Sequence, residues 1–299
     1  MDQAQTLREY MHRFSAEQEV KEVKQSSHVI TITSGKGGVG KTNFTLNFAL
    51  GLKAIGKKVI VLDMDLSTAN INILMGITPK FSLADVLHQK KHIWDIVEHG
   101  IDGINYIYGG LDLEELMDLD QPKLTHFWGQ IQELQAYADY ILLDTGAGIS
   151  KELIDWILAS DETILVTTPE PTSIADSYSV LKTVQHFMED PPTIRLVVNR
   201  VQNFQEGLET ARALQNATSN FLKMDLKTLG FLMEDTHVRQ SVRSQAPFYI
   251  SYPNCIATKN IKQIVAVYVP DNEHKTTGAA PKGMKGIFQK IISIGKWSK

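Results

Sequence analysis

Residues 34–43 read SGKGGVGKTN, and this stretch decides the fold. Three of its glycines match the dinucleotide-binding pattern G-x-G-x-x-G, and the same letters extended by Lys41 and Thr42 match the phosphate loop G-x-x-x-x-G-K-[ST]. Both patterns require a strand before the glycines and a helix after them. The acids Asp63 and Asp65, which end the apolar run VIVLDMD, suit either pattern. The choice separates a hydride-transfer enzyme from a nucleotide-driven switch.

Three features of the chain favour the phosphate loop. Lys41 and Thr42 directly follow the last glycine, where a phosphate loop needs an ammonium for the β- and γ-phosphates and a hydroxyl for Mg²⁺. Lys36 adds a second ammonium inside the loop. The run YILLD ends in Asp144 before TGAG, and an acid at the end of a neighbouring strand can hold the water shell of the metal. The loop is therefore predicted to bind ATP with Mg²⁺.

Short apolar runs rich in β-branched residues alternate with helical patterns along the chain. They are His28–Thr33, Lys58–Leu62, Ile104–Tyr108, Tyr140–Leu143, Thr163–Thr167, Ile194–Val198 and Thr228–Leu232. Runs that are apolar on both faces are typical of a buried parallel sheet. Strands that alternate with helices predict an α/β fold with a doubly wound, mainly parallel sheet flanked by helices.

Composition limits the classes of function. The 299 residues carry a net charge of −4, so the chain as a whole does not attract nucleic acid. The single cysteine, Cys255, excludes an intrachain disulfide and argues against an iron–sulfur carrier, even one that shares a cluster across a dimer. The N-terminus has no apolar core typical of a signal peptide, and no run of apolar residues is long enough to span a bilayer. These features predict a cytoplasmic protein.

The chain is predicted to have four parts. Residues 1–25 form a polar leader with a helical pattern at Leu7, Met11 and Phe14, and residues 26–270 form the nucleotide-binding domain. Residues 271–283 have no apolar anchor and are predicted to be a flexible linker. Residues 284–299 are apolar again and form the fourth part.

The fourth part is predicted to be an amphipathic helix that lies on an anionic membrane. Its apolar arc comprises Met284, Ile287, Phe288, Ile291, Ile292 and Ile294, and Trp297 is available at the level of the lipid headgroups. From residue 282 onward there are five lysines and no acid. A single such helix should bind weakly, whereas the two tails of a dimer should bind far better. The alternative is an ordinary helix packed onto the domain.

The motifs resemble those of one known family. GKGGVGKT, with its extra Lys36, resembles the deviant Walker A motif of the MinD/ParA ATPases, and the resemblance runs from about His28 to Val269. VLDMDLSTANIN resembles the switch I segment of that family, LLDTGAGIS its switch II, TTPEPTSIADSY its ribose-side loop and VVNR the segment whose asparagine reads adenine. Asn43 departs from the second threonine of many members.

The resemblance implies a role for each matching residue. It assigns nucleotide binding to Gly35, Lys36, Gly37, Gly38, Val39, Gly40, Lys41, Thr42, Asn43, Glu170 and Asn199, metal binding to Thr42, Asp63 and Asp144, and catalysis to Lys36, Lys41 and Asp65. Asp65 would orient the attacking water, with Asp63 supporting the metal site. Lys36 would reach the nucleotide of a partner subunit, so hydrolysis would be slow and would depend on an ATP-dependent homodimer.

Three of these roles have a simpler alternative. Asp63 can be a strand-end acid that caps a turn, and Asn199 can be a turn residue after its strand. Glu170, between two prolines, can be a solvated loop charge instead of a residue near a ribose across the interface.

The opening DQAQTLREYM resembles the N-terminal motif of the FlhG (YlxH) branch, which controls flagellar placement and number. In that branch the N-terminus stimulates FlhF, a GTPase of the signal-recognition-particle family. The resemblance assigns partner binding to Gln3, Leu7, Arg8, Met11 and Phe14, with the Gln3 amide orienting a hydrolytic water. It also suggests contacts with flagellar basal-body components. The alternative is a polar leader that matches by chance.

The leading hypothesis is a dimerising ATPase that cycles between the cytoplasm and the inner face of the cell membrane and regulates flagella. The alternatives are a ParA-like DNA-partitioning ATPase and a septum-site MinD. DNA partitioning would require an exposed cluster of basic side chains. The candidate arginines at 195, 200, 212, 239 and 243 are scattered in the sequence, so no nucleic-acid partner is expected.

Overall fold

The computed structural model describes residues 27–65, 71–110, 121–187 and 192–269. The strands in this part of the chain are β1 (His28–Thr33), β2 (Val59–Asp63), β3 (Glu98–His99), β4 (Asn105–Tyr108), β5 (Tyr140–Asp144), β6 (Glu162–Thr167), β7 (Thr193–Val201) and β8 (Lys227–Met233). The helices are α2 (Lys41–Ala54), α3 (Ile71–Met75), α4 (Leu83–Leu87), α6 (Gln121–Tyr137), α7 (Lys151–Ala159), α8 (Pro171–Phe187), α9 (Phe204–Ala217), α10 (Thr236–Arg243), α11 (Phe248–Ser251) and α12 (Ile256–Ala266). Two 3₁₀ turns, η1 (Ile93–Asp95) and η2 (Ile101–Gly103), and one π turn, η3 (Thr218–Leu222), complete the described elements.

The strands form one sheet in the order β3-β4-β2-β5-β1-β6-β7-β8. Strand β1 pairs in parallel with β5 on one side and with β6 on the other, so the order of strands reverses at β1. In open α/β sheets, ligands bind outside the carboxyl ends of the strands at such a reversal. The glycine-rich loop follows β1 and therefore occupies this position.

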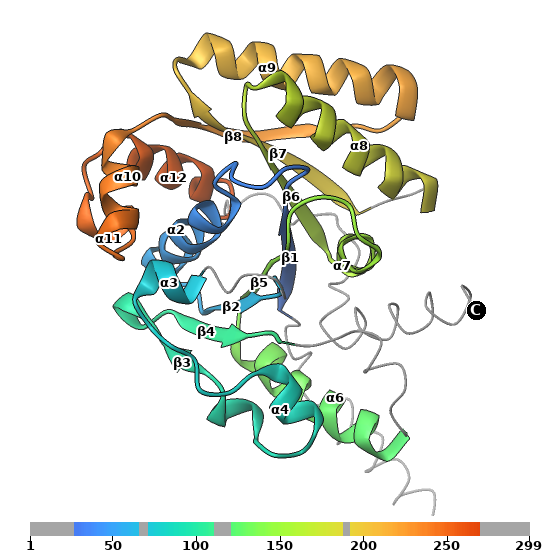
Figure 1. Cartoon of the computed structure of the whole chain (residues 1–299), viewed down its shortest axis with the longest axis vertical. Helices are drawn as coiled ribbons and strands as arrows, with labels where there is room; N and C mark the ends of the chain where they lie inside the picture. Colours follow the sequence, from blue (N-terminus) through green and yellow to red (C-terminus); the bar gives the residue numbers. More distant parts are fainter. Residues whose placement is uncertain (1–26, 66–70, 111–120, 188–191, 270–299) are drawn as a thin grey trace, which may run out of the picture.

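Helices cover both faces of the sheet (Figure 1). Helices α2, α3, α11 and α12 pack on one face, and α4, α6, α7, α8 and α9 pack on the other. The side chains of β2 alternate between the two layers: Val59 and Val61 face the α2 layer, and Ile60 and Leu62 face the α6 layer. All four are buried, which explains why this run is apolar throughout.

The structure confirms the doubly wound, mainly parallel sheet. Each of the seven predicted runs forms a strand, with ends that differ from the predicted ones by a few residues. Strand β3 was not predicted, because two residues paired antiparallel to β4 leave no periodic pattern in the sequence. None of the helices in the described ranges has the length and apolar character needed to cross a bilayer.

Some predictions concern residues outside the described ranges. They are the partner-binding residues Gln3, Leu7, Arg8, Met11 and Phe14, the membrane-binding residues Met284, Ile287, Phe288, Ile291, Ile292, Ile294 and Trp297, and positions 66–70 of the predicted switch I segment. These remain predictions from the sequence.

Candidate functional site

The glycine-rich loop runs from the end of β1 to the start of α2. Gly38 and Gly40 have φ angles of 79° and 92°, in the left-handed region that favours glycine. A β-carbon on Gly38 would meet no atom within 4 Å, whereas one on Gly40 would collide with the amide of Asn199. The loop is therefore open on one side and tightly packed on the other. Its open side and the N-terminus of α2 together make a cradle for anions, because backbone N–H groups and the helix dipole favour negative charge there.

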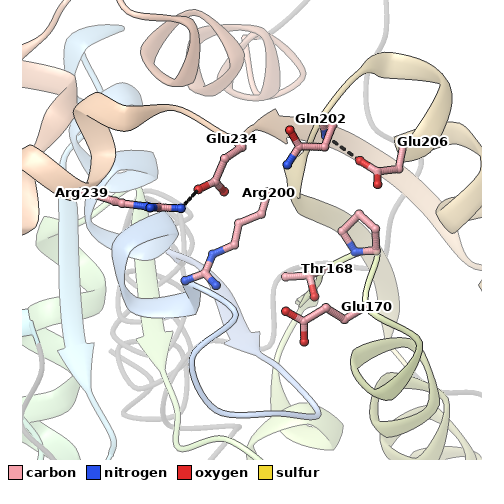
Figure 2. Close-up of a pocket in the computed structure, with 8 residues that line it drawn as sticks. Thr168, Glu170, Arg200, Gln202, Glu206, Glu234 and Arg239 are labelled. Atoms are coloured by element: carbon pink, nitrogen blue, oxygen red, sulfur yellow. Dashed lines mark hydrogen bonds and ion pairs between the residues drawn. The ribbon is translucent and has the colours of Figure 1, made fainter.

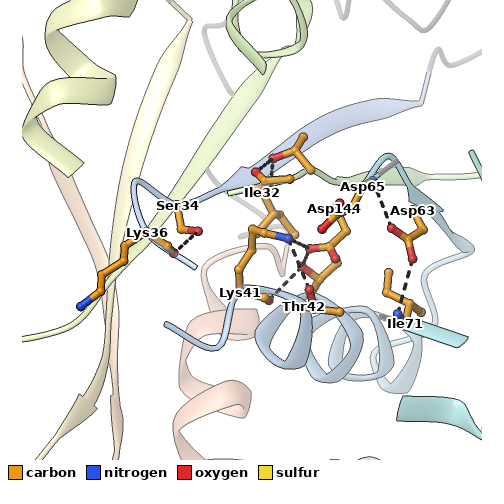
Figure 3. A network of polar contacts seen from close by, with 12 residues as sticks. Ile32, Ser34, Lys36, Lys41, Thr42, Asp63, Asp65, Ile71 and Asp144 are labelled. Atoms are coloured by element: carbon orange, nitrogen blue, oxygen red, sulfur yellow. Dashed lines mark hydrogen bonds and ion pairs between the residues drawn. The ribbon is translucent and has the colours of Figure 1, made fainter. Parts of the chain in front are cut away.

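A buried ion pair lies at the base of this loop (Figure 3). The Nζ atom of Lys41 lies 2.9 Å from Oδ1 of Asp144, and the two side chains are 7% and 0% exposed. The hydroxyl of Thr45 donates to the same Oδ1 atom at 2.7 Å, and Lys41 also donates to the hydroxyl of Thr42 at 3.3 Å. Lys41, Thr42 and Asp144 thus lie together, as the sequence predicted.

Asp63 and Asp144 stand at the same level on neighbouring strands. They are register partners in the parallel pair of β2 and β5, and both are fully buried. Burial and, secondarily, the nearby charge of Asp144 raise the pKa of Asp63 to about 7. A cation between the two carboxylates would offset this repulsion.

Asp63 also shapes the segment that follows β2. Its Oδ1 accepts a hydrogen bond from the backbone N–H of Asp65 at 3.2 Å, and its Oδ2 accepts from Ile71 N and the Tyr106 hydroxyl, both at 3.4 Å. Asp63 therefore orders the start of the predicted switch I segment. The turn-capping alternative and a supporting role at the metal site are both compatible with this geometry.

The donor set fits Mg²⁺. Oδ2 of Asp144 is buried and has no hydrogen-bond partner among the described residues, while Oδ1 already has two donors. A buried carboxylate oxygen normally has a partner, and a metal-bound water or Mg²⁺ itself would supply one. Within the described ranges, no group of three or more His, Cys, Asp or Glu residues could hold a metal by itself. Mg²⁺ usually keeps water and phosphate oxygens among its ligands.

The predicted switch II segment is tied to β1 and to the start of the glycine-rich loop by two hydrogen bonds. The N–H of Gly148 donates to the carbonyl of Ser34 at 3.1 Å, and the Thr145 hydroxyl donates to the carbonyl of Ile32 at 3.0 Å. A β-carbon on Gly146 would lie 3.8 Å from Oδ1 of Asp65. Asp65 thus lies beside the predicted switch II segment.

Lys36 occupies a different place from Lys41. Its side chain points away from the buried pair (Figure 3), and its Nζ donates to Oε2 of Glu170 at 2.9 Å and to the hydroxyl of Thr172 at 3.0 Å. The hydrogen bond and charge of Lys36 hold the pKa of Glu170 below its ordinary value. Glu170 therefore has a partner in its own chain, at an exposed position that is also compatible with a solvated loop charge.

Two neighbouring pockets share Arg200, and the first of them includes Gly40 of the loop. The first, about 480 Å³, is lined by Gly40, Asn43, Asn199, Arg200, Met233, Glu234, Asp235, Val238, Arg239, Val242 and Arg243. Asn199 donates to the carbonyl of Val39 at 2.7 Å and accepts from the N–H of Arg200 at 2.9 Å. Asn199 thus links the end of β7 to the glycine-rich loop at the wall of this pocket.

The second pocket, about 460 Å³, lies beyond Arg200 (Figure 2) and includes Thr168, Glu170, Gln202 and Glu206 in its lining. Arg200 lines both pockets and has a left-handed φ of 59°. Such a conformation is uncommon for residues other than glycine and often marks functional sites. Figure 2 shows the Arg200 side chain extending between Arg239 and Glu170.

The sequence reasoning missed several residues of the site. Thr45 follows the glycine-rich motif by three residues, and Thr172 lies inside the TTPEPTSIADSY segment, but neither was assigned a role from the sequence. The walls that α10 contributes come from a distant part of the chain, and only the fold brings them to the loop. Arg200 directly follows Asn199, a predicted site residue, and this neighbourhood in the sequence could have identified Arg200 as a further residue of the site.

The chain is similar in sequence to one family of known proteins. The ParA family model, described as NUBPL iron-transfer P-loop NTPase, matches residues 25–268. The antiactivator FleN of Pseudomonas aeruginosa is 32% identical over 238 residues, which cover 79% of this chain and 84% of FleN. The flagellum site-determining protein YlxH of Helicobacter pylori is 28% identical over 282 residues, which cover 90% of this chain and 91% of YlxH.

Among solved structures, the septum site-determining protein MinD of Pyrococcus horikoshii, complexed with Mg-ADP, is similar with a TM-score of 0.64 and 26% identity. The match covers 81% of this chain and 96% of that protein. The similarity therefore extends over nearly the whole of a nucleotide-binding relative.

Proposed function

The chain belongs to the ParA family of P-loop NTPases, and from this premise we propose that it is a MinD-like ATPase that regulates flagellar placement and number. The ATPase part of the proposal is supported mainly by the Asp144 carboxylate at the base of the open loop. One of its oxygens accepts from Lys41 and Thr45, and the other has no partner among the described residues. The similarity to FleN and YlxH over most of the chain supports the flagellar part.

The substrate is ATP, which is hydrolysed to ADP and phosphate. The Thr42 hydroxyl and, through water, Asp144 would hold Mg²⁺, which would supply positive charge near the phosphate oxygens. The loop N–H groups and Lys41 bind the phosphates and offset their charge. Asp65 orients the attacking water, and Asp63 positions the backbone of Asp65.

Dimerisation completes the site. A triphosphate held between two subunits carries several negative charges, and a lysine from each side offsets them. In this proposal Lys36 supplies the second ammonium to the nucleotide of the partner subunit, and Glu170 lies near a ribose across the interface. Asn199 reads adenine in the first pocket. Hydrolysis is slow in the monomer, because the monomer lacks the second lysine.

The two ends of the chain connect the ATPase cycle to its partners. The apolar arc and lysines of residues 284–299 attach the ATP-bound dimer to the inner face of the cell membrane. The N-terminal segment binds an FlhF-type GTPase, and Gln3 orients a water in the active site of that partner. Both assignments are supported by the sequence patterns of these segments.

Two other functions are less well supported. A DNA-partitioning ATPase would need an exposed basic cluster. Of the five candidate arginines, Arg200, Arg239 and Arg243 line one pocket, but Glu234 and Asp235 line it as well. Acids among the arginines weaken attraction to phosphates. Iron transfer, named in the description of the matching family model, would need more sulfur ligands than the single Cys255 provides.

The proposal is tested by the association state of the chain with Mg²⁺ and ATP. Sedimentation velocity is measured for the wild type, Lys36→Ala and Asp65→Ala, together with phosphate release. The wild type is expected to dimerise reversibly with ATP, Lys36→Ala to remain monomeric, and Asp65→Ala to stay dimeric because it does not hydrolyse the nucleotide. Calorimetry that detected binding of a nicotinamide or flavin cofactor, and none of ATP, would overturn the proposal.

A further inference from the structure

A buried carboxylate holds the chain where α12 ends. Tyr268 follows the last residue of that helix by two positions, and its hydroxyl donates to Oε1 of Glu162 at 2.6 Å. Glu162 is 5% exposed and is the first residue of β6. Nε of Arg195 lies 2.8 Å from the same oxygen, and Nε2 of His28 lies 3.2 Å from Oε2. One carboxylate therefore joins β1, β6 and β7 to the end of α12.

The ring of Tyr268 is also held in place. It makes edge contacts with the rings of Phe48 in α2 and Tyr140 at the start of β5, with centroid distances of 5.3 and 5.9 Å. Such contacts stabilise aromatic pairs beyond the burial of their area. Burial and, secondarily, the charge of Glu162 raise the pKa of Tyr268 well above its ordinary value, so the hydroxyl stays protonated and remains a donor.

This contact lies at the end of the sheet opposite the glycine-rich loop. His28 and Glu162 are the first residues of the parallel strands β1 and β6, whereas the loop follows Thr33, the last residue of β1. Each of these strands has six residues and spans roughly 17–20 Å. The chain beyond Val269 therefore leaves the domain about one strand length from the anion cradle.

The proposed dimer places the two exit points far apart. Nucleotides held between the subunits require that the carboxyl ends of both sheets face the partner, so the amino ends lie at the two outer poles. A domain of about 240 residues has a radius of roughly 23 Å. When such a dimer lies on a flat membrane, each pole stands about this far above the lipid. Each C-terminal segment has to bridge that gap.

We propose that Tyr268 is a positioning residue for the C-terminal segment: with Glu162 it fixes the exit point at the outer pole, and the predicted linker 271–283 is a spacer of matching length. A flexible chain of thirteen residues has a root-mean-square span of roughly 18–22 Å, close to the gap. A shorter spacer lets only one tail reach the membrane and so removes the gain from two. This inference rests on the proposed function, because it concerns the same tails.

Hydrogen exchange on the nucleotide-free chain tests the anchor. Tyr268→Phe removes the hydroxyl and keeps the ring. Tyr249→Phe, in α11 of the same layer, is the matched control, because no hydrogen bond of its hydroxyl is found among the described residues. Loss of a bond to a carboxylate should speed exchange of the backbone N–H groups of Val267, Tyr268 and Val269 about ten-fold or more. Equal exchange in the two variants overturns the anchor.

Shortening the linker tests the spacer. Deletion of residues 273–279 leaves six of the thirteen residues and removes one acid and one lysine, so the charge of the linker is kept. Six residues reach at most about 21 Å. With Mg²⁺ and a non-hydrolysable ATP analogue, the shortened chain should sediment as a dimer like the wild type, but its flotation with anionic vesicles should fall to the level seen with ADP.

Replacement of residues 273–279 by seven glycines and serines is the matched control. It keeps the length of the linker and should float as the wild type does. Flotation of the shortened chain equal to that of the wild type overturns the spacer, and so does a loss of flotation in the control.

Tyr268→Phe in the shortened chain joins the two tests. Release of the last turn of α12 adds about 10 Å of reach, because an extended residue spans about 3.5 Å and a helical one about 1.5 Å. Tyr268→Phe should therefore restore part of the ATP-dependent flotation, and Tyr249→Phe should restore none. Absence of recovery overturns the positioning role. If the wild type neither dimerises nor floats, the proposed function fails, whereas the exchange rates still decide the anchor.

Discussion

Lys36 and Lys41 extend in opposite directions from one glycine-rich loop. Lys36 is bound at the surface by Glu170 and Thr172, whereas Lys41 is bound in the interior by Asp144. The two ammonium groups are therefore placed to bind different partners. Lys41 is placed to act on a nucleotide in its own cradle, and Lys36 can act elsewhere only after its surface contacts break.

The first prediction concerns the interior pair. Asp144→Asn removes the charge that faces Lys41 and is expected to abolish the effect of Mg²⁺ on ATP affinity, because the amide is a poor substitute for a carboxylate near the metal. Without nucleotide, the free energy of unfolding should fall by about 1–2 kcal/mol. This is less than is usual for a broken buried pair, because the repulsion between Asp144 and Asp63 is also relieved.

Calorimetry with Mg²⁺ and with EDTA measures the first effect, and denaturant unfolding measures the second. Asp139→Asn, at the opposite end of β5, is the matched control and should keep the full Mg²⁺ dependence. Equal Mg²⁺ dependence in Asp144→Asn and the wild type would remove Asp144 from the metal site.

The sequence predicted most of this arrangement. The strand before the loop, the helix after it, and the acids at the ends of β2 and β5 follow from apolar runs and motif spacing, which are local patterns. Parallel pairing then places Asp63 and Asp144 level with each other, because both end strands of the same sheet.

The rest depends on tertiary contacts that leave no local pattern. Val238 and Arg239 line the first pocket together with Gly40, although they are far from it in the chain. Lys36 and Thr172 are likewise far apart in the sequence and in contact in the fold. Arg200 has a left-handed backbone conformation at the point where the pairing of β7 with β8 shifts register. The residue types in this segment do not predict that shift. Sequence patterns place the elements, and packing decides which side chains meet.

The second prediction concerns pH and the buried Asp155 of α7, which is 3% exposed. Burial raises the pKa of Asp155 to about 6, and Lys151 offsets this only in part. Because the pKa in the folded state lies above that in the unfolded chain, the folded state binds the proton more tightly. Asp155 therefore costs no stability at low pH, and it destabilises the fold increasingly as the pH rises from about 4 through 6.

Asp155→Asn should accordingly raise the free energy of unfolding at about pH 8 by roughly 1–3 kcal/mol and leave it nearly unchanged at about pH 4. Thermal unfolding across this range is the measurement. Glu152→Gln, at an exposed position of the same helix, is the control and should show little change. A less stable Asp155→Asn at the higher pH would mean that the carboxylate has a stabilising role.

The third prediction concerns the C-terminal segment. Ile291 belongs to the predicted apolar arc and Gln289 lies outside it, so Ile291→Asp and Gln289→Asp introduce the same charge on different faces. In flotation with anionic vesicles, the wild type should float with ATP and much less with ADP, since two tails bind better than one. Ile291→Asp should lose flotation about ten-fold or more, and Gln289→Asp should keep most of it. Equal recovery of all variants, or equal recovery with ATP and ADP, would contradict a membrane tail that acts through dimerisation.

The last prediction concerns the N-terminal segment. A peptide of residues 1–23 carries the whole motif and should accelerate GTP hydrolysis by an FlhF-type GTPase without the rest of the chain, because its role requires only a docked helix and one amide beside the attacking water. Gln3→Ala removes that amide and should lower the stimulated rate about ten-fold or more at saturating peptide, with peptide affinity preserved. Gln5→Ala removes the same chemical group two positions away and should retain the stimulation.

Leu7→Ala should act differently, by weakening binding while leaving the saturated rate nearly intact, since an apolar docking residue contributes to affinity and not to the orientation of water. Stimulation that survives Gln3→Ala would assign the segment to docking alone.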